Sequence, residues 1–166
     1  ADDKNLMEIF KTGGNFHSNI AKLVFNLPCE AEDIAEFYPT QRQAAKAVTF
    51  GIMYGAGANK ISQQVTSDSG KPFTKSQAQE VIDDYFKQFH KLKKWIDLSS
   101  KFIMDNGFIY GATGRKRRLP NVNSDNQGIQ SHEVRSGMNF LVQSVASDIN
   151  LLGGIDMNEY IKRNNI

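Results

Sequence analysis

The chain has 166 residues, of which 40% are hydrophobic and 23% are charged, and its formal net charge is +2. This composition is typical of a globular protein with a packed core and excludes a disordered chain; no apolar run reaches the ~18 residues that a membrane helix requires. The single cysteine, Cys29, excludes an internal disulfide and fits a reducing, cytoplasmic compartment.

The beginning of the chain predicts short helices. Residues 4–12 and residues 17–26 carry apolar side chains at helical spacing, and Gly13–Gly14 ends the first of these two helices. Residues 29–38 are acidic and predict a short helix or loop.

An alanine-rich helix is predicted next. Thr40 is followed three residues later by Gln43, the spacing of a capping box, in which both side chains bond to backbone groups at the start of a helix. We therefore expect a helix from Thr40 to Tyr54, ended by the glycine-containing residues 55–57. A shorter helix follows at about residues 59–66.

A second capping box, from Thr74 to Gln77, predicts a long helix that runs to about Asp105. At this length we expect a bend or a break, and Ser99–Ser100 is the predicted place. The apolar stripe of this helix includes Val81, Tyr85, Phe89, Leu92 and Ile103.

The last part of the chain predicts a hairpin and a helix. Residues 108–110 and residues 117–119 flank a glycine-containing turn, which is typical of a β-hairpin. A helix is expected over residues 130–160, with an interruption at Gly153–Gly154. The fold class is therefore predicted as mainly α, an α-rich α+β protein, with one small basic hairpin.

The alanine-rich helix carries a stripe of cationic and aromatic side chains. Its members fall four residues apart: Arg42, Lys46, Phe50 and Tyr54. On a helix each lies only ~40° round and ~6 Å along from the one before. Two cations followed by two rings suit a nucleoside triphosphate, because cations pair with phosphate oxygens and rings pack on sugar and base. The alternative is an ordinary amphipathic helix whose Arg and Lys reach into solvent.

Positive charge is concentrated in one run of four cations, residues 115–118. This run carries more positive charge than the net charge of the chain, so the rest of the chain is acidic. On a hairpin these cations suit DNA phosphates, which carry no base information. The alternative is a solvated basic loop.

The last predicted helix repeats the spacing of four, with Arg135, Asn139 and Gln143. The arginine can meet a phosphate. The two amides each donate and accept, so they can touch the minor-groove acceptors that all base pairs share. The alternative is a polar face on a surface helix.

Residues 42–55, RQAAKAVTFGIMYG, resemble the nucleotide-binding helix of family A DNA polymerases, the group of bacterial DNA polymerase I and related phage replicases. Single-subunit RNA polymerases share part of the spacing but usually carry methionine where this chain has Phe50, which favours a DNA polymerase. The resemblance implies catalytic, triphosphate-binding roles for Arg42 and Lys46. It implies a sugar and base contact for Phe50, and places Tyr54 and Gly55 beside the nucleotide and the templating base.

The resemblance extends along the chain. Residues 13–18 are similar to a Gly-x-Asp-Ile-His-Thr segment, which implies that His17 approaches the triphosphate, although Asn15 replaces the usual Asp. Residues 114–120 are similar to a Gly-Arg-Arg-Arg hairpin beside the duplex, and residues 135–148 to the helix before the last catalytic motif. The DNA-binding residues implied by these two segments are Arg115, Arg117, Arg118, Arg135, Asn139 and Gln143.

The two carboxylate motifs that hold Mg²⁺ in this family are not found in the chain. In the family they lie just before and just after the region that this chain resembles. Asp83–Asp84 diverge on a helix and His132–Glu133 lie outside a hairpin, so neither pair is assigned a metal. We expect residues 1–166 to be a single region, the fingers plus part of the palm, that is inactive alone, with Mg²⁺ bound elsewhere in the full-length enzyme.

These observations predict a fragment of a DNA-directed DNA polymerase, a nucleotidyltransferase of a bacterium or phage that acts in replication or repair. Its expected partners are dNTP and primer–template DNA, with no membrane partner, and its oligomeric state stays open. One alternative is a non-catalytic nucleic-acid-binding helical module, which would ignore dNTP. Another is a helical interaction domain, which would show no salt-dependent DNA binding.

Overall fold

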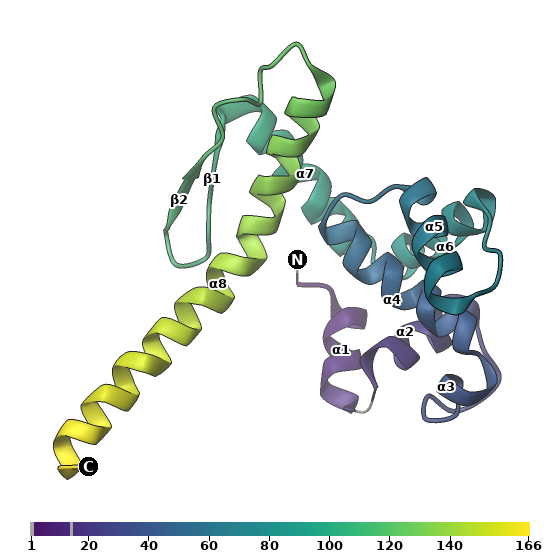
Figure 1. Cartoon of the computed structure of the whole chain (residues 1–166), viewed down its shortest axis with the longest axis horizontal. Coiled ribbons are helices and arrows are strands. Elements are labelled where there is room, and N and C mark those ends of the chain that lie inside the picture. Colours follow the sequence, from purple (N-terminus) through teal and green to yellow (C-terminus); the bar gives the residue numbers. More distant parts are fainter. Residues whose placement is uncertain (1, 14) are drawn as a thin grey trace. The chain divides into compact units, whose positions relative to one another are not determined.

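Figure 1 shows the chain as a computed structural model, which describes residues 2–13 and 15–166 apart from the side chains of Thr12 and Met53. The described residues are mainly helical and include a single two-stranded antiparallel sheet, as the sequence predicts. Contacts divide the chain into two compact units, Ala1–Asp97 and Leu98–Ile166. Among the described residues no helix is both long and apolar enough to cross a membrane.

The elements follow one another in the order that the sequence pattern predicts. They are α1 (Lys4–Thr12), α2 (Phe16–Phe25), α3 (Ile34–Phe37), α4 (Pro39–Met53), α5 (Ala58–Ser69), α6 (Lys75–Gln88), α7 (His90–Asn106), β1 (Phe108–Tyr110), β2 (Lys116–Arg118) and α8 (Gln127–Asn164). Gly13 caps the C-terminus of α1 with a positive φ of 73°, and the neighbouring Gly14, also predicted to end this helix, lies outside the described residues.

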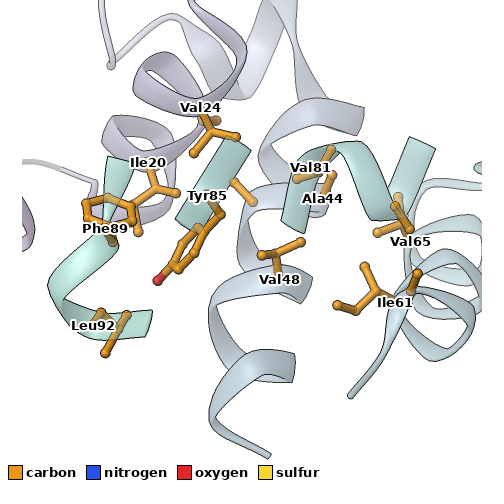
Figure 2. Close-up of a cluster of buried hydrophobic side chains, with 14 of the residues drawn as sticks. Ile20, Val24, Ala44, Val48, Ile61, Val65, Val81, Tyr85, Phe89 and Leu92 are labelled. Carbon is orange, nitrogen blue, oxygen red and sulfur yellow. The ribbon is translucent and has the colours of Figure 1, made fainter. Parts of the chain in front are cut away.

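The core of the first unit surrounds α4. The apolar side of α4 is fully buried at Ala44 and Val48. Figure 2 shows Val48 between Tyr85 on one side and Ile61 on the other, so α4 is enclosed by α2, α5 and α6. The small side chains on this face let the neighbouring helices approach closely. The opposite side of α4 faces the surface.

The start of α4 differs from the prediction. The helix begins at Pro39, and its N-cap Tyr38 makes no side-chain capping bond, so the capping box predicted at Thr40 and Gln43 is wrong. A proline suits the first helical position because its φ is already helical and its missing N–H would have no partner there. Thr40 therefore lies inside the first turn. The C-terminal end is as predicted, with Tyr54 as the C-cap.

The long helix predicted from Thr74 is divided at Phe89, and not at Ser99–Ser100. Phe89 has φ −116° and ψ 55°, and its side chain is fully buried. Asp3 supplies the reason: its Oδ2 accepts hydrogen bonds from the N–H groups of Lys91 and Leu92, 3.1 and 3.2 Å away, at the start of α7. The capping box at the start of α6 is confirmed.

The second unit combines the hairpin with α8. Tyr110 pairs with Lys116 in an antiparallel register, which confirms the hairpin. Helix α8 is continuous, so the interruption predicted at Gly153–Gly154 is wrong. Each glycine costs a helix only about 1 kcal/mol relative to alanine, and the flanking residues are able to propagate the helix across them. Residues 149–166 are all exposed.

Candidate nucleotide and DNA contact sites

The four side chains that we call the α4 stripe are Arg42, Lys46, Phe50 and Tyr54. Arg42 is half-buried and the other three are exposed. Phe50 and Tyr54 keep 50% and 49% of their surface exposed, although a packed core lies directly behind them. Large rings held at the surface by a rigid helix are available to stack on or pack against a ligand.

Helix α2 brings His17 to the α4 stripe. The ring centroids of His17 and Phe50 are 5.3 Å apart. Asn15 is the N-cap of α2, and its Oδ1 accepts a hydrogen bond from the N–H of Ser18, 3.2 Å away. Asparagine and aspartate cap helices equally well, so Asn15, in place of the usual Asp of the family segment, preserves the local structure that positions His17.

An aromatic row leads from α1 to the α4 stripe. Phe10 and Phe16 stack with ring centroids 4.5 Å apart, Phe16 meets His17 at 5.5 Å, and His17 meets Phe50. The sequence analysis did not single out Phe10 or Phe16. Their only signal was their place on either side of the glycines before His17.

Two buried nitrogen atoms at this site lack hydrogen-bond partners among the described residues. The Nε of Arg42 and the Nε2 of His17 are buried and have no hydrogen-bond partner among the described residues. Burial, then the charges of Arg42 and Lys46, hold the pKa of His17 below its usual value, which favours the neutral imidazole. Because the Nε of an arginine is always a donor, a bound anion would satisfy it.

A pocket of about 390 Å³ lies between the α4 stripe and α5. Lys46, Phe50 and Tyr54 line one side of it. The α5 side is formed by residues that the sequence analysis missed: Lys60, Gln64 and Asp68. They also fall four residues apart, so the same spacing rule would have found them.

Gly51 is required by the fold of the first unit. A Cβ there would lie 3.1 Å from the Cβ of Ala56 and 3.2 Å from the Cγ1 of Ile61. The chain that follows α4 therefore occupies the space that the missing side chain leaves. Gly55 has a positive φ of 67°, which allows the chain to turn at the end of α4.

In the second unit, three of the four hairpin cations have partners. Arg115 forms an ion pair with Asp148 of α8, and Arg117 donates a hydrogen bond to the Oγ of Ser136, 2.9 Å away. The Nζ of Lys116 lies 3.7 Å from the ring centroid of Phe108. The fourth, Arg118, is exposed and has no hydrogen bond or ion pair among the residues that the structure describes.

The polar residues predicted on the last helix lie on α8, which is unbroken through them. Arg135 and Asn139 are half-buried and Gln143 is exposed. Their spacing of four places them along one face of α8, next to the hairpin within the same unit. Their contact with DNA stays a prediction.

Comparisons with known proteins now decide the family. A model of DNA polymerase family A matches residues 1–166. The chain belongs to this family. The DNA polymerase of Escherichia phage T5 is 44% identical over 96% of this chain and 21% of its own length. DNA polymerase I of Caldicellulosiruptor bescii is 32% identical over the whole chain and 18% of its own length. The chain thus spans about a fifth of the length of these curated relatives.

A solved structure of a family A polymerase has the same fold. It is the POL domain of Pol1 from M. smegmatis in complex with DNA primer-template and dNTP. The two chains are 27% identical with a TM-score of 0.83, over 99% of this chain and 27% of the other. The mainly helical architecture of the chain is therefore that of part of a polymerase domain.

Family A polymerases generally use Mg²⁺, and the described residues do not fit this ion. Among them no group of three or more His, Cys, Asp or Glu side chains could hold a metal. Asp83 accepts a hydrogen bond from Gln79 and Asp84 forms an ion pair with Lys87, so these adjacent carboxylates have separate partners. We assign no metal ligand and no metal-dependent step to this chain.

Proposed function

We propose that residues 1–166 are the fingers and adjoining palm helices of a longer DNA-directed DNA polymerase, and that they bind the incoming dNTP and primer–template DNA. The enzyme would act in replication or repair in the cytoplasm of a bacterial or phage-infected cell. The observation that carries this proposal is the α4 stripe, where two cations and two half-exposed rings lie in order beside buried nitrogens without partners.

The nucleotide is proposed to lie along the α4 stripe. Arg42 and Lys46 would hold the triphosphate, and the orphan Nε of Arg42 would donate to a phosphate oxygen. Neutral His17 would donate through Nε2, which also lacks a partner. Phe50, beside His17, would pack on sugar and base. Fixed cations at the triphosphate favour the transition state, because charge on the phosphates changes as the bond breaks.

Primer–template DNA is proposed to contact both units. In the first, Tyr54 and Gly55 at the end of α4 would border the templating base. In the second, the hairpin and α8 would hold the duplex through phosphate contacts and minor-groove hydrogen bonds. The residues proposed for the second unit, which either contact DNA themselves or hold the contacting residues in place, are Arg115, Arg117, Arg118, Arg135, Asn139 and Gln143.

In the complete enzyme, the 3′ hydroxyl of the primer would attack the α-phosphate of the dNTP, and pyrophosphate would leave. Mg²⁺ held elsewhere in the enzyme would supply positive charge to this phosphoryl transfer. We propose that its ligands lie outside residues 1–166. The contribution of this chain is to orient the dNTP and neutralise its phosphates.

The alternative, a non-catalytic nucleic-acid-binding module, explains the basic hairpin but does not explain the α4 stripe. A module of this kind needs phosphate-binding cations and no ordered site for a nucleoside triphosphate. Its DNA affinity would be the same with and without dNTP. The likeness to a POL domain in complex with primer-template and dNTP supports the polymerase proposal.

The isolated 166-residue chain is expected to bind primer–template DNA in a salt-dependent way but to synthesise no DNA with Mg²⁺ and dNTPs. The physical reason is that, among the residues that the structure describes, no cluster of carboxylates could hold the metal ions. Primer extension and fluorescence-anisotropy binding, on a sample whose helicity is checked by circular dichroism, provide the measurement. Robust extension by the pure chain would contradict the proposal.

A further inference from the structure

One face of α8 is turned toward the hairpin, and we call it the hairpin-facing stripe. Its members fall four residues apart: Ser136, Phe140, Ser144 and Asp148. Ser136 accepts the hydrogen bond from Arg117 in β2, and Asp148 accepts from Thr113 and Arg115 at the hairpin turn. The hairpin therefore lies along about 18 Å of α8, and Figure 1 shows the two side by side.

The middle of this contact leaves no room for a side chain. A Cβ at Gly111 would lie 2.6 Å from the Oγ of Ser144 and 3.6 Å from the Cε1 of Phe140. The backbone at the end of β1 thus rests directly on α8. With Ser136 at one end and Asp148 at the other, the hairpin has one position along the helix and one rotation about it.

The candidate DNA-contacting residues of α8 lie on the adjacent face. Each of Arg135, Asn139 and Gln143 immediately precedes a member of the hairpin-facing stripe in the sequence. One residue corresponds to a rotation of ~100° about the helix axis. Docking of the hairpin therefore fixes the angle between the hairpin cations and these three side chains.

Asp148 holds the end of the hairpin that is nearest the turn. Its side chain is 11% exposed, and both of its oxygens are used, Oδ1 by Arg115 and Oδ2 by Thr113. A carboxylate this buried needs such partners, because its desolvation is otherwise unfavourable. The charge of Arg115, whose side chain is 49% exposed, is consequently balanced by Asp148 and directed toward α8.

Arg117 and Arg118 lie on opposite faces of the hairpin. Neighbouring residues of a strand point to opposite faces, so Arg117, which bonds to α8, lies on one face and Arg118 on the other. Arg118 is exposed and has no hydrogen bond or ion pair in the part of the chain that the structure describes. It is the hairpin arginine whose charge is free to meet a phosphate.

Given the proposed function, on which this inference rests, we propose that Asp148 is a positioning residue for DNA binding. Through Arg115 and Thr113 it holds the hairpin on α8, so that Arg118 and the polar face of α8 meet the duplex at a fixed angle. Arg115 acts on DNA through this contact with Asp148, and Arg118 contacts a phosphate directly.

The test measures primer–template affinity as a function of salt for the polymerase that contains these residues. The variants are Arg115→Gln, Asp148→Asn, the two combined, and Arg118→Gln as the matched arginine control. Arg115→Gln and Asp148→Asn should each weaken binding on the order of tenfold, the loss of one charge-assisted hydrogen bond, with an unchanged log–log salt slope. Combined, they should weaken it no further, because both remove the same contact.

Arg118→Gln should instead lower the salt slope by ~0.9, as expected for one lost phosphate contact. Thr113→Val, a substitution at the exposed turn, provides a second variant of the contact and should weaken binding in the same direction as Asp148→Asn. Melting curves identify the folded temperature range, and binding is measured well below it, so that a loss of stability alone leaves the affinity unchanged.

Three results would overturn the positioning role. One is a drop of ~0.9 in the salt slope for Arg115→Gln, which would make Arg115 a phosphate contact. Another is tighter DNA binding by Asp148→Asn, which would mean that Asp148 merely withholds Arg115 from DNA. The third is wild-type affinity for Arg115→Gln, Asp148→Asn and Thr113→Val while Arg118→Gln binds DNA less tightly. If the unaltered polymerase shows no salt-dependent DNA binding, the proposed function fails, and this inference fails with it.

Discussion

Replacing Lys46 with alanine in the full polymerase is expected to lower kcat/KM for dNTP incorporation. The fall should correspond to ~1.5–3 kcal/mol of lost transition-state stabilisation, the range of a hydrogen bond to a charged group. Lys46 lies in the middle of the α4 stripe and lines the pocket beside it. Phosphate charge is present in the bound dNTP and changes during transfer, so both nucleotide binding and the chemical step should suffer. Single-turnover kinetics separate the two.

The matched control is Lys87→Ala on α6. Lys87 is exposed and pairs with Asp84, away from the α4 stripe, so its removal should leave kcat/KM unchanged. Phe50→Ala offers a second comparison, because a ring that packs on the sugar is insensitive to phosphate charge. Its effect should fall on nucleotide affinity and differ between deoxy- and dideoxynucleotides. An unchanged rate and affinity for Lys46→Ala would contradict the assignment of the α4 stripe.

Phe89→Ala is expected to lower the free energy of unfolding by ~3–5 kcal/mol, as is typical when a fully buried aromatic side chain is removed. Phe89 is 0% exposed, lies between α6 and α7, and packs against Tyr85 with ring centroids 4.7 Å apart. The cavity would open in the core that supports the back of α4. Urea denaturation followed by circular dichroism measures the change.

Phe37→Ala is the control for this prediction. Phe37 is 63% exposed, so its truncation should change the free energy of unfolding by ~0.5 kcal/mol or less. If Phe89→Ala destabilised the protein no more than Phe37→Ala, the packing around the α6–α7 junction would differ from that described above.

Most of the fold could be predicted because it depends on local periodicity. Helix α4 shows why: its apolar residues recur on one side, its stripe of functional residues on the other, and both follow from a repeat of 3.6 residues. The break at Phe89 could not be predicted in this way. It depends on Asp3, a residue far away in the sequence, whose carboxylate caps α7.

The candidate sites could also be predicted from the sequence only in part. The spacing of four along α4 and α8 predicted two rows of side chains, and the family resemblance added His17. The partners of these side chains could not be predicted, because Arg115 meets Asp148 across 33 positions of sequence. The buried, unpaired nitrogens of Arg42 and His17 likewise depend on how α2 packs against α4.

The most direct test of the central claim, that the α4 stripe binds a triphosphate, is a titration of the polymerase–DNA complex with a phosphate series. The ligands are dATP, dADP, dAMP and deoxyadenosine opposite a template thymine, with the unaltered enzyme, Arg42→Ala and Lys46→Ala. We predict that affinity for the unaltered enzyme falls as phosphates are removed. Each variant should weaken the binding of dATP most and of deoxyadenosine least, so that the affinities of the four ligands differ less than in the unaltered enzyme. Equal affinities for dATP and deoxyadenosine, or an equally steep series in both variants, would contradict the claim.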